Sequence, residues 1–442
     1  MKKTTTMIFF LLLQTCYYYT SAQQGGNREK EDSPCLEYVV CDSTDSGSSA
    51  ALCVKKIGKT VLDANWRLIH DVSGYKKCEA VGGGWDAILC PDEKACARNC
   101  ALEGISQEKY RDEYGVTTVH NELSLQYDIL KNKGSRSYLA DENAAYVPFK
   151  LLNKTLKVDI DVSQIPCRAI GALYLIDIDH HGDLGMGYNN AGSAYGTGYG
   201  DAQSPTDIKF VRGVANMHGN IGSSATEIDI FEANNQALAW TLHPCSKSGP
   251  CHERGCEDNC DRSGADMNPY RQGNFNFYGP GKILDSSEKF TVSTTFHTSH
   301  LFNGEEELVE VSQYYEQKGK RIEYPTSPIL GNRRSITKES IENQNSAFQN
   351  KDLNFERHGG FKSLTNSLKK GMTLVFSVWG DPVTHMQWLD GTVPPGSTKP
   401  GAKRGPCPIA EDIKRHHLRH RHQQNKVTAF FSNIRIVPAT QQ

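Results

Sequence analysis

The chain has 442 residues, of which 38% are hydrophobic and 23% charged, with 14 cysteines and a formal net charge of −2. This ordinary composition excludes disordered, collagen-like and coiled-coil proteins. The near-zero charge gives no electrostatic reason to expect nucleic acid or an anionic membrane as a partner. A chain of this length can bury a large core, either as one long all-β unit or as two or three domains.

The N-terminus has the order of features that is typical of a secretory signal peptide. Lys2 and Lys3 precede an apolar run over 7–13, and small residues follow at 20–22. The apolar run is too short to span a bilayer, which takes about 20 residues. We therefore expect residues 1–22 to be removed and the rest of the chain to be secreted.

The cysteines agree with export. Cys16 lies within the predicted signal peptide, which leaves an odd number in the rest of the chain. The others cluster over 35–100 and 245–260, apart from Cys167 and Cys407. Zinc is disfavoured because the spacings are irregular and no paired C-x-x-C blocks occur. Disulfides with one unpaired thiol are therefore expected.

Apolar or alternating runs recur along the chain, separated by turns rich in Gly, Asn and Asp. Short strands with long loops and no βαβ rhythm predict an all-β antiparallel sandwich. No linker or internal repeat divides residues 35–442, so one domain fits best. A loop is expected over 182–200, and strands are expected over 60–62, 156–162, 172–178, 227–231, 290–296, 374–379 and 427–436.

Two local motifs carry little functional information. The basic run 413–422 contains four histidines that are conceivable metal ligands, namely His416, His417, His420 and His422. A solvated basic segment is favoured, because no carboxylate or cysteine accompanies the run. Asn153 begins a glycosylation sequon.

The segment 227–232 has three acidic residues at an informative spacing. Side chains two apart in a β-strand project to the same face, so Glu227 and Asp229 are neighbours. Glu232 would face the other side of a regular strand. A one-residue β-bulge after Asp229 would return it to the common face, and bulges are frequent beside active sites. Ile228 and another large apolar side chain would then face the opposite side.

Three carboxylates this close repel one another, which raises the pKa of at least one of them. A protonated acid beside an ionised carboxylate is the pair that glycoside hydrolysis needs. An amphipathic strand with a solvated acidic face would have the same pattern. A calcium site is a third interpretation, although the glycine turn of the usual oxygen-ligand loop is absent.

Tryptophans in polar surroundings favour a sugar ligand, because the flat C–H faces of sugars pack on aromatic rings. Trp66, Trp379 and Trp388 each have Asp, Asn, Gln or Arg nearby in the sequence. A single Trp more often belongs to a core. Three in such settings favour a ligand surface.

The segment 227–234 (EIDIFEAN), followed by His243-Pro-Cys, resembles the signature of glycoside hydrolase family 7, the cellobiohydrolases and endoglucanases of fungi and protists. Colinear matches extend over nearly the whole chain. They include DANWR from Asp63, LCPD from Leu89, YGVTT from Tyr114, DVSQIPC from Asp161, GALY from Gly171, AYGTGY from Ala194, NPYR from Asn268, YGP from Tyr278 and FSNI from Phe431.

The resemblance implies a concanavalin A-like β-sandwich, or jelly roll, with long loops that form a substrate groove. Residues 23–442 would be one catalytic domain. Glu227 would be the nucleophile, Glu232 the acid/base and Asp229 the support of Glu227, with His243 close to the acid/base. The implied substrate-binding residues are the sugar-stacking Trp66, Trp379 and Trp388, the polar groove residues Arg136, Tyr174, Tyr199, Asp201, Gln203 and Lys209, and Asp266, Arg271 and Arg404 around the leaving product.

The resemblance also implies a disulfide pattern. Two family disulfides are missing as whole pairs, because no cysteine occurs over 200–204 or 224–225, and a cysteine expected near Ala265 is missing together with its partner. Ala101 replaces the usual partner of an N-terminal cysteine, which leaves Cys35 as the expected unpaired thiol. The implied pairs are Cys41–Cys53, Cys78–Cys100, Cys90–Cys96, Cys167–Cys407, Cys245–Cys260 and Cys251–Cys256.

The loops give opposing indications about the mode of attack. The stretch 216–227 is shorter than in cellobiohydrolases with long tunnels, the region 251–260 is trimmed, and Leu68 replaces a tunnel-entrance tryptophan. The stretches 325–360 and 391–407 nearly keep the lengths found in cellobiohydrolases. We therefore favour a cellobiohydrolase with reduced tunnel enclosure over an endoglucanase with an open cleft.

The sequence thus predicts a secreted, monomeric, retaining β-1,4-glucanase that acts on cellulose. No metal or cofactor is expected, and no nucleic acid or membrane partner. A catalytically inactive, lectin-like glucan-binding protein is the alternative from another class, because a fold does not prove an activity; the mutually repelling carboxylates argue against it. A related β-glucanase with a preference for mixed-linkage glucan or xylan is a third possibility.

Overall fold

The computed structural model describes residues 30–42, 52–80, 83–300, 304–351, 353–381, 383–408 and 426–439. The predicted signal peptide over 1–22 and the histidine-rich run over 413–422 lie outside these residues. Among the described residues, no helix combines the length and the apolar character needed to cross a membrane.

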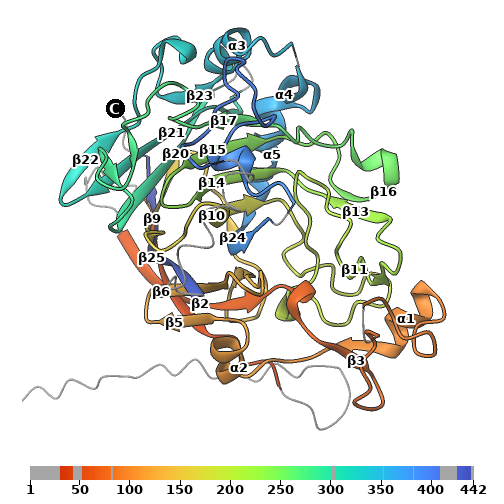
Figure 1. The fold of residues 1–442 in the computed structure, drawn as a ribbon. Helices are drawn as coiled ribbons and strands as arrows, with labels where there is room; N and C mark the ends of the chain where they lie inside the picture. Colours follow the sequence, from red (N-terminus) through yellow and green to blue (C-terminus); the bar gives the residue numbers. More distant parts are fainter. Residues whose placement is uncertain are drawn as a thin grey trace, which may run out of the picture.

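The strands form two layers (Figure 1). The first layer, in order of hydrogen-bonded neighbours, consists of β17 (Ala265–Met267), β15 (Leu238–His243), β14 (Glu227–Ala233), β10 (Ala169–Ile176), β24 (Met372–Gly380), β7 (Ser135–Ala140) and β2 (Leu52–Leu62), with β8 (Pro148–Phe149) also on β24. The second layer consists of β25 (Lys426–Pro438), β9 (Lys154–Asp161), β20 (Phe290–His300), β21 (Glu306–Gln317), β22 (Lys320–Glu323) and β23 (Ser335–Thr337), with β6 (Glu122–Asp128) beside β25 and β5 (Val116–Val119) beside β6.

One strand joins the two layers. β1 (Cys35–Asp42) pairs antiparallel with β2 and parallel with β25. The remaining short strands belong to the loops and are β3 (Ile69–Asp71), β4 (Cys100–Leu102), β11 (Phe210–Val211), β12 (Val214–Ala215), β13 (Ile221–Ser224), β16 (Gly249–His252), β18 (Tyr278–Gly279) and β19 (Leu284–Asp285).

Helices are short and lie around the sandwich. Several start with a polar cap; the Asp92 side chain, for example, accepts from the backbone N–H of Ala95 at the start of α1. The α-helices are α1 (Glu93–Asn99), α2 (Gln107–Asp112), α3 (Lys338–Ala347), α4 (Asn354–Arg357), α5 (Gly360–Lys370) and α6 (Gln387–Asp390), and the 3₁₀ turns are η1 (Ala64–Trp66), η2 (Ser193–Tyr195), η3 (Glu253–Cys256) and η4 (Pro328–Leu330).

Apolar side chains from the facing sides of the two layers form the main core. The ring of Phe231 on β14 lies 5.9 Å from that of Phe290 on β20. The ring of Phe376 on β24 likewise lies 5.4 Å from that of Phe431 on β25. The predicted all-β sandwich is therefore confirmed. Each of the seven predicted strands overlaps an observed strand, and 182–200 is a loop that contains only η2.

All six implied disulfides are present. The expectation of an unpaired thiol at Cys35 is wrong, because Cys35 is disulfide-bonded as well. That expectation depended on leaving Cys16 out with the signal peptide. With Cys16 counted, the sequence has 14 cysteines, an even number, so the count no longer requires an unpaired thiol.

Candidate active site

The acidic strand β14 contains the predicted bulge. Against β15, Glu227 pairs with His243 and Asp229 with Thr241, whereas Glu232 pairs with Ala239, so β14 has one extra residue between the last two pairs. The register with β10 shifts at the same place.

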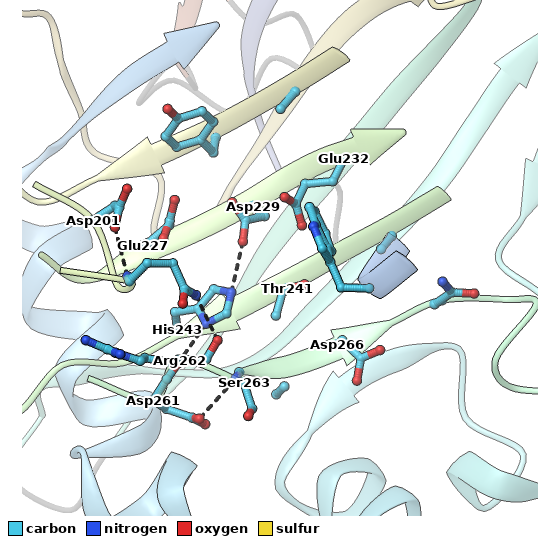
Figure 2. Close-up of a pocket in the computed structure, with 18 of the residues that line it drawn as sticks. Asp201, Glu227, Asp229, Glu232, Thr241, His243, Asp261, Arg262, Ser263 and Asp266 are labelled. Atoms are coloured by element: carbon cyan, nitrogen blue, oxygen red, sulfur yellow. Dashed lines mark hydrogen bonds and ion pairs between the residues drawn. The ribbon is translucent and has the colours of Figure 1, made fainter. Parts of the chain in front are cut away.

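Because of this bulge, two consecutive side chains, Ile230 and Phe231, both face the core together with Ile228. Figure 2 shows Glu227, Asp229 and Glu232 in a row along β14. Glu227 and Asp229 are only 8% and 5% exposed, which excludes a solvated acidic face.

His243 is the cation of this row. Its Nε2 lies 3.0 Å from Oδ2 of Asp229, and its Nδ1 lies 2.7 Å from the carbonyl oxygen of Asp261 (Figure 2). Both partners are acceptors, so both ring nitrogens must donate a proton. Burial opposes the charged ring, but the hydrogen bond and the charge of Asp229 raise the pKa of His243 to about 10. We call Glu227, Asp229, Glu232 and His243 the acid cluster.

Asp229 binds the histidine of this row. The resemblance implies that Asp229 supports Glu227. Among the described residues, its recorded side-chain partner is His243. The physical reason is that a carboxylate oxygen accepts hydrogen bonds, and the protonated ring of His243 donates one. Asp229 therefore orients the histidine, and the pair lies beside Glu227.

Glu227 and Glu232 have different surroundings. Burial and the charges of Asp229 and Asp201 raise the pKa of Glu227 well above its ordinary value, while His243 and the N–H of Ala202, which donates to Glu227 Oε2 at 3.0 Å, act in the opposite direction. Burial and the charges of Asp229 and Asp266 also raise the pKa of Glu232 well above its ordinary value, against the charge of His243. No hydrogen bond to the Glu232 carboxyl is recorded within the described ranges. The N–H of Ala202 thus favours ionisation at Glu227 over Glu232, which has no such donor among these contacts.

A groove of about 1210 Å³ passes over this row. Its lining includes the acid cluster and most of the substrate-binding residues that were predicted from the sequence. These are Trp66, Arg136, Tyr174, Tyr199, Asp201, Gln203, Asp266, Arg271, Trp379, Trp388 and Arg404. Lys209 does not line the groove: its Nζ lies 3.1 Å from the carbonyl oxygen of Arg67 and 2.9 Å from Glu79.

Stacked aromatic and cationic groups build one part of the groove wall. The Arg136 guanidinium lies 3.2 Å from the ring centroid of Tyr199 and 5.1 Å from that of Trp66. Buried Asp63 accepts from Arg136 Nε at 3.0 Å and so holds the guanidinium in place. Trp379 is 39% exposed, which leaves its ring accessible to a ligand.

A second charged group lies in the same groove. Asp266 accepts hydrogen bonds from Arg271 and from Nε2 of Gln344. Nη1 of Arg404 lies 4.0 Å from Oδ2 of Asp266. Burial alone would raise the pKa of Asp266, but the two arginines outweigh it and lower that pKa. We call Asp266, Arg271 and Arg404 the arginine cluster.

Several groove residues were missed by the sequence reasoning. They come from loops and helices far apart in the chain, and include Lys131, Lys133, Arg262, Gln344 and Phe348. Arg262 is connected to the nominated residues, because its carbonyl oxygen accepts from Gln203 Nε2 at 2.9 Å. No local pattern marked these positions, since loop residues of ordinary polarity have no periodicity to recognise.

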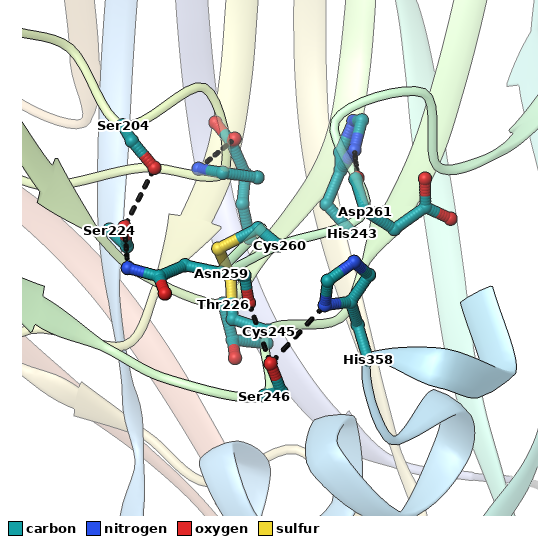
Figure 3. The surroundings of a disulfide bond; sticks show 12 residues. Ser204, Ser224, Thr226, His243, Cys245, Ser246, Asn259, Cys260, Asp261 and His358 are labelled. Atoms are coloured by element: carbon teal, nitrogen blue, oxygen red, sulfur yellow. Dashed lines mark hydrogen bonds between the residues drawn. A yellow bond between two sulfur atoms is a disulfide. The ribbon is translucent and has the colours of Figure 1, made fainter. Parts of the chain in front are cut away.

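The Cys245–Cys260 disulfide lies beside the acid cluster (Figure 3). It holds the start of the loop whose Asp261 carbonyl accepts from His243. Near it, the hydroxyl oxygens of Ser204 and Ser224 are 2.7 Å apart, and Asn259 Nδ2 donates to Ser224. These serines occupy the two segments in which the missing family cysteines were expected.

The described residues contain two close groups of potential metal ligands, namely Cys78, Cys90 and Cys100, and Cys167, Asp390 and Cys407. Every cysteine in these groups belongs to a disulfide, so neither group offers a free thiolate. The acidic residues of β14 are not part of either group.

Comparison with known proteins agrees with this geometry. The family described as glycosyl hydrolase family 7 matches residues 25–441. A cellobiohydrolase of this family from Daphnia pulex is 32% identical, with a TM-score of 0.84 over 95% of this chain and 100% of that chain. A Melanocarpus albomyces cellobiohydrolase complexed with cellotetraose is 32% identical, with a TM-score of 0.81 over 95% and 100%. An endoglucanase I complexed with cellobiose is 31% identical, with a TM-score of 0.78 over 94% and 98%.

Proposed function

The chain belongs to glycosyl hydrolase family 7, a family of cellulases, and we propose that it is a secreted retaining β-1,4-glucanase that acts on cellulose as a cellobiohydrolase. The observation that carries the proposal is the row of Glu227, Asp229 and Glu232 on the groove face of β14. The similar structures that contain cellobiose or cellotetraose support a β-glucan substrate.

The proposed reaction divides the work between two carboxyl groups. Glu232 protonates the glycosidic oxygen while the Glu227 carboxylate attacks the anomeric carbon. Glu232 then takes a proton from water, which displaces Glu227 with net retention. The imidazolium of His243 and the N–H of Ala202 support the ionised form of Glu227. The raised pKa of Glu232 supports its role as the proton donor.

Glu227→Gln tests this assignment. It removes the nucleophile and keeps the shape of the side chain, so hydrolysis of cellulose should fall to background. Substantial residual hydrolysis would contradict the assignment. In the wild type, proton NMR should detect the β-anomer as the first sugar released.

Cellobiohydrolase action is the finer part of the proposal. The arginine cluster supports it, because three charged side chains surround one part of the groove and can hold a disaccharide product. The shorter loops over 216–227 and 251–260 favour endo attack instead, and solved relatives of both kinds are similar to this chain. A time course should compare soluble cellobiose with reducing ends left on the solid. A high soluble fraction is expected, and a low one would favour the endoglucanase.

A lectin-like role and a different polysaccharide specificity would each give a distinct result. Binding of glucan without new reducing ends would indicate a lectin-like protein. A panel of cellulose, mixed-linkage glucan and xylan tests the substrate preference, with cellulose expected to be hydrolysed fastest.

Secretion is tested by sequencing the N-terminus of exported protein, which should begin at residue 23.

A further inference from the structure

The bulge in β14 leaves Ile230 without a register partner on either neighbouring strand. Its carbonyl oxygen is instead bound from the opposite layer. Gln313 of β21 donates through Nε2 to this oxygen at 2.7 Å. A side chain of the second layer thus contacts the backbone of the acidic strand between Asp229 and Glu232.

The amide of Gln313 is held by further hydrogen bonds. Its Nε2 also donates to Thr294 Oγ1 at 2.9 Å, and its Oε1 accepts from the hydroxyl of Tyr315 at 2.9 Å. Gln313 is 3% exposed, and Thr294 and Tyr315 are fully buried. The amide therefore has one orientation, and it presents an N–H to Ile230.

A glutamine in this apolar core is costly unless its polar atoms are bonded. Its neighbours Ile230 and Phe231 belong to the main core, where leucine or methionine would avoid that cost. The carbonyl of Ile230 would then lie buried and unpaired, which is costly too. The hydrogen bond satisfies both groups, but only while the bulge stays at this position.

We infer that Gln313 is a positioning residue that holds the bulge of β14 in place and thereby keeps Glu232 on the groove face. The role of Glu232 itself rests on the proposed function. Glu227, Asp229 and Glu232 all have register partners on both neighbouring strands, but the extra residue of the bulge lies between Asp229 and Glu232. A weakened bulge therefore changes the position of Glu232 relative to the other two carboxylates. A slip of one residue would turn Glu232 toward the core.

The test compares Gln313→Leu with Gln317→Leu. Gln317 is a matched control: it lies four residues further along β21, is 7% exposed, and hydrogen-bonds the backbone of Asp285 through both amide atoms. It has no recorded contact with β14 among the described residues. Gln313→Met is a second, unbranched variant in case the leucine variant does not fold.

The activity measurement is kcat/KM on two aryl β-cellobiosides. A strongly acidic phenol such as 2,4-dinitrophenol departs with little protonation, whereas a weakly acidic phenol needs the proton from Glu232. Displacement of Glu232 should lower kcat/KM for the weakly acidic phenol by about 10–100-fold, and for dinitrophenol much less. Gln317→Leu should not change the ratio of the two. Equal losses on both substrates, or the same ratio change in the control, would overturn the inference.

Amide hydrogen exchange of the segment 227–233 tests the bulge without turnover. Exchange at 230–232 should be faster in Gln313→Leu than in the wild type and in Gln317→Leu, and equal exchange in all three would overturn the inference. If the wild type hydrolyses neither cellobioside, the proposed function fails. The exchange result then still decides whether Gln313 holds the bulge.

Discussion

The acid cluster and the arginine cluster lie in one groove but differ in charge balance. In the acid cluster three carboxyl groups have one cationic partner, His243, among the described contacts, and the pKa values of Glu227 and Glu232 are raised. In the arginine cluster one carboxylate has two cationic partners, and the pKa of Asp266 is lowered. Where carboxyl groups outnumber cations, a carboxyl group can keep a proton that it donates in the reaction. Where cations outnumber carboxyl groups, the carboxylate stays ionised and the cluster has a net positive charge, which suits binding.

The largest effect should come from removing the proton donor. Glu232→Gln keeps the side-chain shape but has no transferable acidic proton, so kcat/KM on cellulose or on a cellobioside with a weakly acidic phenol should fall about 10²–10⁴-fold. Steady-state kinetics on both cellobiosides check this. A comparable loss of kcat/KM on the dinitrophenyl cellobioside, whose leaving group needs little protonation, would argue against Glu232 as the acid.

Removal of the cation His243 should make the charge balance of the acid cluster differ even more from that of the arginine cluster. In His243→Gln the pKa values of Glu227 and Glu232 should both rise, because His243 lowers both in the wild type. Glu227 must be ionised and Glu232 protonated, so both limbs of the pH profile of kcat/KM should move to higher pH. On the acidic side, activity should fall about tenfold for every pH unit by which that limb moves. An unchanged profile would contradict this electrostatic role.

Neutralising the other carboxylate should affect binding. Asp266→Asn weakens the contacts that hold Arg271 and Arg404, so the inhibition constant of cellobiose should rise about tenfold, as expected for loss of one charged hydrogen bond. Because the charge of Asp266 also raises the pKa of Glu232, the alkaline limb of the pH profile of kcat/KM should move slightly to lower pH, opposite to its movement in His243→Gln. Movement of both limbs to higher pH with unchanged inhibition by cellobiose would reverse the distinction between the two clusters.

The raised pKa of His243 should also make the stability of the folded protein depend on pH. The pKa of His243 is raised to about 10 in the folded protein, against an unfolded value of about 6.5. Its contribution to stability is fully present below the unfolded value and is lost as the pH rises toward 10. Between pH 7 and 10, Tm should fall more in the wild type than in His243→Gln, by about 2 °C for each kcal/mol lost. Parallel melting curves would exclude this contribution.

The smallest effect is expected at Lys209, which belongs to neither cluster. Its ammonium group is bound to Glu79 and to the carbonyl of Arg67 outside the groove lining. Lys209→Ala should change kcat/KM on cellulose within about twofold, in line with the small energies of partly exposed ion pairs. A tenfold rise of KM would instead indicate direct contact with the substrate.

Much of the acid cluster could be predicted, because its chemistry lies within one short segment. Alternation puts Glu227 and Asp229 on one face, and only a bulge can add Glu232. The bond of Asp229 to His243 was not predicted, since it depends on the register between β14 and β15. Lys209 was predicted as a groove residue from the resemblance alone. A resemblance does not say where the side chain points in this chain.

The sequence by itself determined the all-β class, the positions of the main strands, the acidic row with its bulge and, through resemblance, six disulfides. These features depend on local alternation or on motifs, and both are readable along one segment. Tertiary structure alone decided the cation beside Asp229, the arginine cluster around Asp266 and the contact of Gln313 with Ile230. The physical reason is that each depends on the distance between segments far apart in the chain, which is set by how the layers and loops pack.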